Sequence, residues 1–173
     1  SSPEEYGNHF AWGETEPKTT CLWSTYKHCK GSYDTMTKYC TSSEYGAVDN
    51  KIELEAADDA ATANWSSDWQ MPSYEQFDEL FNSSYTATTW TTLNGVSGYE
   101  ITSKSNGNSI FLPAAGWRHD TQLSGRGECG NYWSSTPYDN LADRAYHLAF
   151  YKGYRIIDRN YRINGRSVRP VCD

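Results

Sequence analysis

Arginine and tyrosine are concentrated at the C-terminal end of this 173-residue sequence. Arginine can donate two parallel hydrogen bonds to a carboxylate, and tyrosine offers a rigid ring with a polar tip. The combination is typical of binding hot spots and antibody paratopes. Six of the eight arginines fall within the last 40 residues and are interspersed with five tyrosines. The arginines are Arg144, Arg155, Arg159, Arg162, Arg166 and Arg169, and the tyrosines are Tyr138, Tyr146, Tyr151, Tyr154 and Tyr161.

These residue types predict a surface that binds a protein or glycan ligand through side chains alone. Aspartate and asparagine from the same stretch would add adaptable polar contacts. The residues that we expect to contact the ligand are Tyr138, Asp139, Asn140, Asp143, Arg144, His147, Tyr151, Tyr154, Arg155, Asp158, Asn160, Tyr161, Arg162 and Asn164.

The charge distribution argues against nucleic acid as the partner. Residues 1–133 carry 8 basic and 18 acidic side chains, a net charge of -10, whereas residues 134–173 carry 7 basic and 4 acidic side chains, a net charge of +3. The acidic body and the sequence pI of about 5.1 argue against a protein whose affinity depends on phosphate neutralisation, although a nucleic-acid groove would also combine arginine with aromatic residues.

Motifs for catalysis or metal binding are not found in the sequence. It contains no nucleophile elbow, phosphate loop or H-E-x-x-H pattern, and its four histidines lie far apart, at His9, His28, His119 and His147. We therefore expect a protein that is not an enzyme and that needs no cofactor, with calcium left open in the absence of a motif.

The five cysteines lack the C-x-x-C spacing of zinc or thioredoxin sites. Outside the cell, two disulfides and one free thiol would fit, with a local pair among Cys21, Cys29 and Cys40 and a long-range pair between Cys129 and Cys172. Five reduced thiols are the alternative.

Length and hydropathy predict one domain without a membrane-spanning segment. The mean hydropathy is -0.81, no apolar run approaches 18 residues, and 26 aromatic side chains supply the apolar bulk of the core. The chain opens abruptly at Ser1, without an initiator methionine or a leader, which favours a processed or trimmed product.

Several elements can be predicted from local patterns. The alanine-rich stretch 53–65 favours a helix, with Asp58 and Asp59 acting as caps. Ser73 and Gln76 form a capping box for a second helix that we expect over 73–82. Residues 99–103 and 109–113, joined by an Asn-Gly turn, predict a β-hairpin.

Further strands are expected nearer the C-terminus. In 145–151 the alternation places Tyr146, Leu148 and Phe150 in the core and His147 on the opposite face. Residues 152–165 lack a steady period and predict exposed strand and loop, and 166–171 predict a short terminal strand with Val168 buried.

Longer strings carry a family resemblance that covers about residues 6–171. They are AWGETEP, KYC, LEAADDAATANW, DWQMPSYEQFDEL, NGVSGYEITSKSNGNSIFLPAAGW, YWSSTP and GRSVRPV. The chain resembles the Fibrobacter succinogenes-type major paralogous domain of surface and secreted proteins in gut bacteria. The resemblance implies an α+β, C-type lectin-like fold with two helices, short antiparallel sheets and much irregular loop, related to the formylglycine-generating-enzyme domain. Relatives usually carry a further Trp-containing strand before the point where this chain begins.

The activities of those relatives do not transfer to this sequence. Formylglycine-generating enzymes bind copper through two cysteines that are close together in the chain, and Cys129 and Cys172 are far apart. Calcium-dependent lectins use Glu-Pro-Asn or Gln-Pro-Asp with Trp-Asn-Asp, and none of these motifs is present. A formylglycine-generating-enzyme-like activity is thus the least favoured alternative.

The chain also resembles the variable proteins of diversity-generating retroelements, which rewrite adenines in a C-terminal stretch. Rewriting the adenines of asparagine codons never produces Lys, Gln, Glu, Met or Trp. These five types make up 29 of residues 1–133, so about 9 would be expected in the last 40 residues. Only Lys152 occurs there.

The resemblance implies a constant scaffold over about 1–133 and a variable, ligand-binding region over about 134–166. Reachable types occupy 19 positions that we expect to lie outside the core: 138–141, 143, 144, 147, 149, 151, 154–158, 160–162, 164 and 166. The segments YWSST and 167–171 and the residues Ala145, Tyr146, Leu148 and Phe150 match the family strings instead. A β-rich segment that avoids helix-forming residues is the alternative explanation, and would leave a surface module of fixed sequence. We expect an extracellular or cell-surface setting, on a lipoprotein or pilus tip, or alternatively a phage particle.

Overall fold

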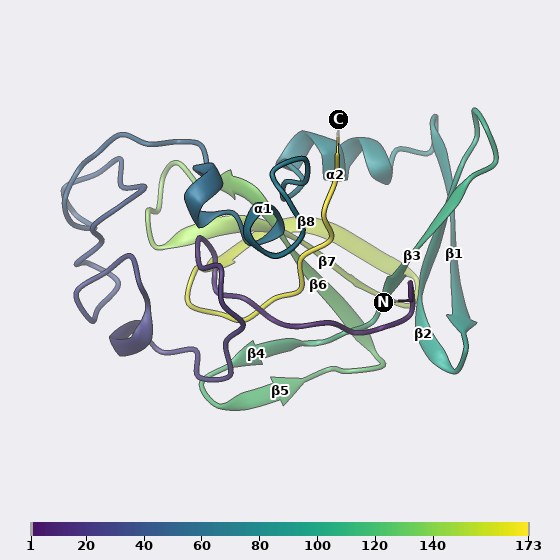
Figure 1. Cartoon of the computed structure of the whole chain (residues 1–173), viewed down its shortest axis with the longest axis horizontal. Helices are drawn as coiled ribbons and strands as arrows, with labels where there is room; N and C mark the ends of the chain where they lie inside the picture. Colours follow the sequence, from purple (N-terminus) through teal and green to yellow (C-terminus); the bar gives the residue numbers. More distant parts are fainter. Residues whose placement is uncertain (1, 173) are drawn as a thin grey trace.

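The computed structural model of the chain describes residues 2–172, so the expected trimming at Ser1 lies outside the described residues. The fold is α+β, with two helices and three small antiparallel sheets (Figure 1). The helices are α1 (Ala60–Asn64) and α2 (Tyr74–Leu80), with 3₁₀ turns at η1 (Trp23–Thr25) and η2 (Ala56–Asp58). The strands are β1 (Thr86–Leu93), β2 (Val96–Ser103), β3 (Ser109–Pro113), β4 (Trp117–His119), β5 (Gln122–Ser124), β6 (Cys129–Pro137), β7 (Arg144–Tyr151) and β8 (Tyr154–Tyr161).

The sheets are β1-β2-β3, β4-β5 and β6-β7-β8, each in sequence order. In Figure 1 the β6-β7-β8 sheet lies at the centre, with β1-β2-β3 at one end of the molecule and the irregular loops of about residues 20–55 at the other. The N-terminal segment begins beside β2 and β3. No helix among residues 2–172 is long and apolar enough to cross a membrane.

The helix α2 confirms the capping-box prediction. The Ser73 hydroxyl accepts from the Gln76 backbone N–H at 3.2 Å, and the Gln76 side chain accepts from the Ser73 N–H at 2.9 Å. Each interaction satisfies a backbone N–H that a helix start otherwise leaves unpaired. Phe77 anchors the helix in the core.

The first predicted helix is much shorter than 53–65, because η2 and α1 are separated at Asp59. Asp59 is the N-cap of α1, as expected, and its carboxylate accepts from the N–H groups of Ala61 and Thr62. Asp58 is not a cap, since its carboxylate is buried and accepts from the Lys27 ammonium at 2.7 Å, the Lys38 ammonium at 2.6 Å and the Tyr39 hydroxyl at 2.8 Å. These bonds tie η2 to the irregular segment 27–39.

The predicted hairpin is confirmed as β2 and β3, with Ile101 opposite Ile110. Strand β1 was not predicted, because its threonine-rich sequence shows little alternation of apolar residues. It pairs with β2 along its whole length, and Trp90 packs edge-on against Tyr99 across the pair at 5.3 Å between ring centroids.

Strand β7 confirms Leu148 and Phe150 as core residues, but Tyr146 is only half-buried and His147 is buried. Both faces of its first half are covered, because Ala145 and Trp133 pack into one cluster while Leu148 joins another. Of residues 152–165, the strand β8 is exposed as expected, whereas 162–165 are buried. Residues 166–171 form isolated bridges instead of a strand, and Val168 is half-buried.

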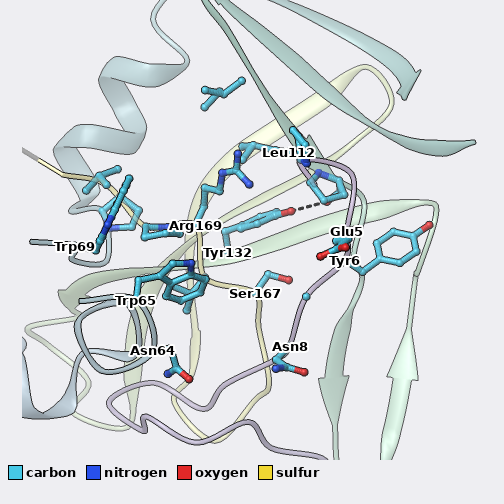
Figure 2. A pocket seen from close by; sticks show the side chains of 18 of the residues that line it. Glu5, Tyr6, Asn8, Asn64, Trp65, Trp69, Leu112, Tyr132, Ser167 and Arg169 are labelled. Carbon is cyan, nitrogen blue, oxygen red and sulfur yellow. Dashed lines mark hydrogen bonds between the residues drawn. The ribbon is translucent and has the colours of Figure 1, made fainter. Parts of the chain in front are cut away.

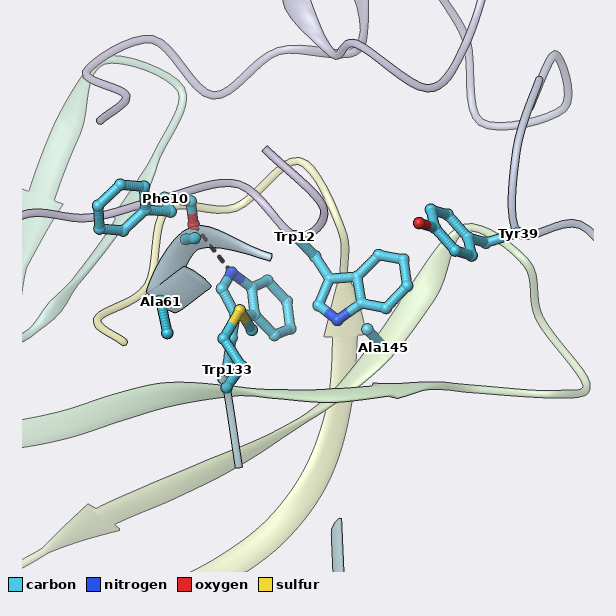
Figure 3. Close-up of a cluster of buried hydrophobic side chains, with 8 residues drawn as sticks. Phe10, Trp12, Tyr39, Ala61, Trp133 and Ala145 are labelled. Carbon is cyan, nitrogen blue, oxygen red and sulfur yellow. Dashed lines mark hydrogen bonds between the residues drawn. The ribbon is translucent and has the colours of Figure 1, made fainter. Parts of the chain in front are cut away.

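Two tryptophans organise the central cluster and explain why the N-terminal segment follows the sheet. The Trp133 indole donates to the carbonyl of Phe10 at 2.9 Å, and the Trp12 indole donates to the carbonyl of Ser134 at 2.8 Å (Figure 3). Both rings are fully buried, with Tyr39 edge-on to Trp12. A buried indole needs a hydrogen-bond acceptor, and here the two acceptors join segments more than 120 residues apart.

All five cysteines are unpaired in the structure, so the predicted disulfides are wrong and the alternative of free thiols holds. Cys21 and Cys40 are buried, Cys29 and Cys129 are half-buried, and Cys172 is exposed. The fold is held together by aromatic packing and buried hydrogen bonds.

Candidate functional site

The hairpin of β7 and β8 brings most of the predicted ligand-contacting residues onto one part of the molecule. The two strands pair from Arg144 opposite Tyr161 to Tyr151 opposite Tyr154, and β8 is the outer strand of its sheet. Tyr151 and Tyr154 stack at 4.9 Å between ring centroids beside the tight turn, where Gly153 has a φ of +82°. An outer strand has no neighbour along one edge, so a ligand can approach its backbone edge as well as its side chains.

A ladder of alternating arginine and tyrosine side chains covers one face of the hairpin. The Arg159 guanidinium lies 5.2 Å from the Tyr138 ring centroid, and Arg144 lies 4.8 Å from that of Tyr161. Tyr146 packs edge-on against Tyr138 at 5.3 Å. Cation–π contacts of this kind hold long side chains in defined positions, so less conformational entropy is lost when a ligand binds.

Arg155 extends this face towards α2. Its guanidinium lies 5.3 Å from the Phe81 ring centroid and donates to the Phe81 carbonyl at 3.3 Å and the Thr88 hydroxyl at 3.4 Å. Among the described residues it forms no ion pair with a carboxylate. A groove of about 230 Å³ adjoins it, lined by Phe77, Asp78, Phe81, Asn82, Leu148, Arg155, Ile156 and Ile157. An acidic group on a ligand could pair with Arg155 while an apolar group enters the groove.

The opposite face of the hairpin exposes Tyr151, Tyr154 and Ile156, each with more than two fifths of its surface accessible. Asp158 is also accessible and lies 3.3 Å from the Arg159 guanidinium, an exposed pair that contributes little to stability. We call the accessible set the β7–β8 surface: Tyr138, Arg144, Tyr146, Tyr151, Tyr154, Arg155, Ile156, Asp158, Arg159 and Tyr161. Asp139 and Asn140 are exposed in the loop beside it, and Asn160 is half-buried at its edge.

Four predicted contact residues are buried and do not belong to this surface: Asp143, His147, Arg162 and Asn164. Arg162 is fully buried, 4.5 Å from the Trp12 ring centroid, and donates to the carbonyls of Tyr39 and Arg144. It therefore holds the fold together. Asn164 uses its amide internally, donating to Asn160 at 2.9 Å.

Burial changes the acid–base behaviour of His147 and Asp143, the other two buried residues of the predicted contact set. His147 packs edge-on against Trp133, and its burial, with the nearby Arg166 charge, holds its pKa well below the usual 6.5. Burial also raises the pKa of Asp143. Neither side chain can reach a ligand. The strand alternation places His147 on the side opposite Leu148, but only the tertiary structure shows that this side is covered as well.

Residues from distant segments, which no sequence pattern singled out, also contribute to this surface. Tyr74 at the start of α2 packs against Tyr146 at 4.8 Å, and Trp23 packs against Tyr161 at 6.0 Å. Phe81 supports Arg155. No local pattern marks these residues, because their role arises from contacts made by chain segments 72 to 138 positions away.

Among residues 2–172 no three His, Cys, Asp or Glu side chains are grouped closely enough to hold a metal ion. The family described as Domain of unknown function (DUF8237) matches residues 85–171. This range contains all eight strands and the whole β7–β8 surface. No curated protein matches the chain. No solved structure matches it either. The family match covers just over half of the 173 residues, and the chain belongs to this family.

Proposed function

We propose that this chain is a ligand-binding module, built on a C-type lectin-like scaffold, whose β7–β8 surface is diversified by a retroelement. The rigid tyrosines would supply contact area, and the arginines would bind carboxylates on a protein or glycan ligand. The setting would be the surface of a cell, on a lipoprotein or pilus tip, or a phage particle.

The observation that carries the proposal is the burial of the two sets of positions in the last 40 residues. Of the 19 positions with types reachable from asparagine codons, 14 are at least partly accessible, and five are buried: Asp143, His147, Arg162, Asn164 and Arg166. The positions of this stretch that match the family strings include the buried residues Ser134, Ala145, Leu148, Phe150 and Ser167. A surface free to vary on a fixed core would have this distribution.

The unpaired polar atoms of the interior support the same proposal. Five buried side-chain atoms have no hydrogen-bond partner within residues 2–172, and all five lie between residues 143 and 167: Asp143 Oδ1, Arg144 Nε, His147 Nδ1, Arg166 Nε and Ser167 Oγ. Asp143 Oδ1 and Arg144 Nε lie 3.7 Å apart as an ion pair without a hydrogen bond, and a buried polar atom with no partner at all costs about 1 to 3 kcal/mol. Four of the five residues occupy reachable positions, as expected where side chains change faster than their surroundings can adapt.

Sequencing this gene from its native population tests the diversification directly. We expect substitutions to concentrate at accessible positions of 134–166, with the codons of YWSST and of 167–171 unchanged and codons 1–133 nearly invariant. A tail as invariant as the body would refute diversification and leave a module of fixed sequence.

Binding to a glycan array and to a panel of purified cell-surface proteins tests the surface itself. Replacing Tyr151, Tyr154 and Tyr161 with alanine removes three exposed rings and should abolish binding of any ligand that the parent chain binds. A matched control replaces Tyr33 and Tyr85, which are equally exposed but lie outside the β7–β8 surface. Equal binding by both variants would place the ligand elsewhere.

A further inference from the structure

A cavity of about 820 Å³ lies apart from the β7–β8 surface, between the N-terminal segment, α2, β3 and the C-terminal segment (Figure 2). None of its lining residues belongs to that surface. Its walls are mainly apolar, formed by Phe10, Phe77, Leu80, Leu112, Trp65 and Trp69. Its volume falls within the range of small-molecule sites, which combine an apolar lining with a few polar groups that orient the ligand.

One charged donor among the described residues of this cavity has no partner. Arg169 lines the cavity from the C-terminal segment, two residues after Ser167. Ser167 is only 3 % exposed and its hydroxyl is buried, so that hydroxyl is not offered to a ligand. Arg169 is half-buried, and within residues 2–172 its guanidinium forms no hydrogen bond or ion pair. Figure 2 shows Arg169 beside the Tyr132 ring, whose own hydroxyl donates to the Pro113 carbonyl at 2.6 Å.

The remaining charge in the lining limits which ligand would fit. Glu5, on the N-terminal segment, is the one acidic residue among the described lining residues, and it is exposed. A second negative charge on the ligand would be repelled by Glu5, whereas a single carboxylate could pair with Arg169. A half-buried guanidinium without a counter-ion favours an anionic partner, because the apolar surroundings weaken screening by water.

We propose that this cavity binds a small monocarboxylate with an apolar body, a chain or a ring system. The carboxylate accepts hydrogen bonds from the Arg169 guanidinium. The apolar body lies against the side chains of Trp65 and Trp69 and the apolar floor. The site is independent of the β7–β8 surface, so a fixed C-terminal sequence would leave this inference intact.

A matched pair of fluorescent probes tests the proposal: 11-(dansylamino)undecanoate and its methyl ester, which differ in the carboxylate charge. We expect the acid to bind at least about tenfold more tightly than the ester, because a charge-assisted pair forms only with the acid. Energy transfer from tryptophan to the dansyl group reports that the probe is bound. Similar affinities for acid and ester, or no binding of either probe, would overturn the proposal.

Variants assign the carboxylate to its partner. Arg169→Gln should lower the affinity for the acid about ten- to a hundredfold, to that of the ester, and leave the ester unaffected. Arg169→Lys should keep part of the preference, and Trp65→Ala should weaken both probes. Arg155→Gln, an exposed arginine on the β7–β8 surface, is the matched control and should change neither. Parent-like binding of the acid by a folded Arg169→Gln, checked by near-ultraviolet circular dichroism, would refute the assignment.

Discussion

Replacing Arg162 with alanine separates a structural role from the binding role that its sequence position predicted. The side chain is fully buried, with its guanidinium over the Trp12 ring and its N–H groups donating to the carbonyls of Tyr39 at 3.0 Å and Arg144 at 2.9 Å. Alanine removes these contacts, leaves the buried Tyr39 carbonyl without its donor and opens a cavity, while the Arg144 carbonyl keeps the hydrogen bond from the Tyr138 N–H at 3.1 Å. We expect the free energy of unfolding to fall by about 3 to 5 kcal/mol.

Urea unfolding, followed by tryptophan fluorescence and by circular dichroism, measures this change. The midpoint should fall while the slope with denaturant stays constant, because the folded structure is otherwise retained. Arg162→Met restores part of the packing but not the hydrogen bonds, so its free energy of unfolding should lie between that of the parent chain and that of Arg162→Ala. Arg159→Ala, at an exposed arginine of the same strand pair, should cost less than about 0.5 kcal/mol. A loss below about 1 kcal/mol for Arg162→Ala would refute the structural role.

Three further outcomes follow from buried groups. Burial alone would raise the pKa of Asp58, but hydrogen bonds from lysine and tyrosine hold it well below 3.8. The contribution of the ionised carboxylate to stability is therefore complete above about pH 4 and is lost on acidification. Asp58→Asn should lower the melting temperature at pH 7, and the melting temperature of this variant should fall less steeply than that of the parent chain below pH 4. Burial lowers the pKa of His9 to about 4 and that of His147 well below 6.5. Both imidazoles therefore stay neutral in the folded chain near pH 6, whereas the unfolded chain binds protons there, so the free energy of unfolding should fall as the pH drops below 6.5. Neither imidazole should titrate near pH 6 when followed by NMR. A Cβ at Gly130 would lie 2.1 Å from the Phe150 ring. Gly130→Ala should therefore lower the free energy of unfolding by about 3 kcal/mol or more in thermal unfolding. A change within about 0.5 kcal/mol would show that the ring can move aside.

Local sequence chemistry determined the elements whose stabilising contacts are close along the chain. The capping box at Ser73 fixes the start of α2 through bonds that span three residues. The Asn-Gly turn and the alternation around it specify the β2–β3 hairpin in the same way. The aromatic and arginine content of the tail likewise predicted an accessible surface on β8, because an exposed outer strand needs no partner to display its side chains.

Only the tertiary structure decided which polar residues of the tail face inward. The types of Arg162 and His147 are those of a binding surface, yet Trp12 and Trp133, contributed by other segments, cover them. Asp58 becomes a buried partner of two lysines because η2 packs against a segment some 20 to 30 residues earlier. Burial and pairing depend on contacts between distant parts of the chain, whereas a sequence pattern reports only its own neighbourhood. The unpaired Arg169 in its apolar cavity is a product of the same long-range packing.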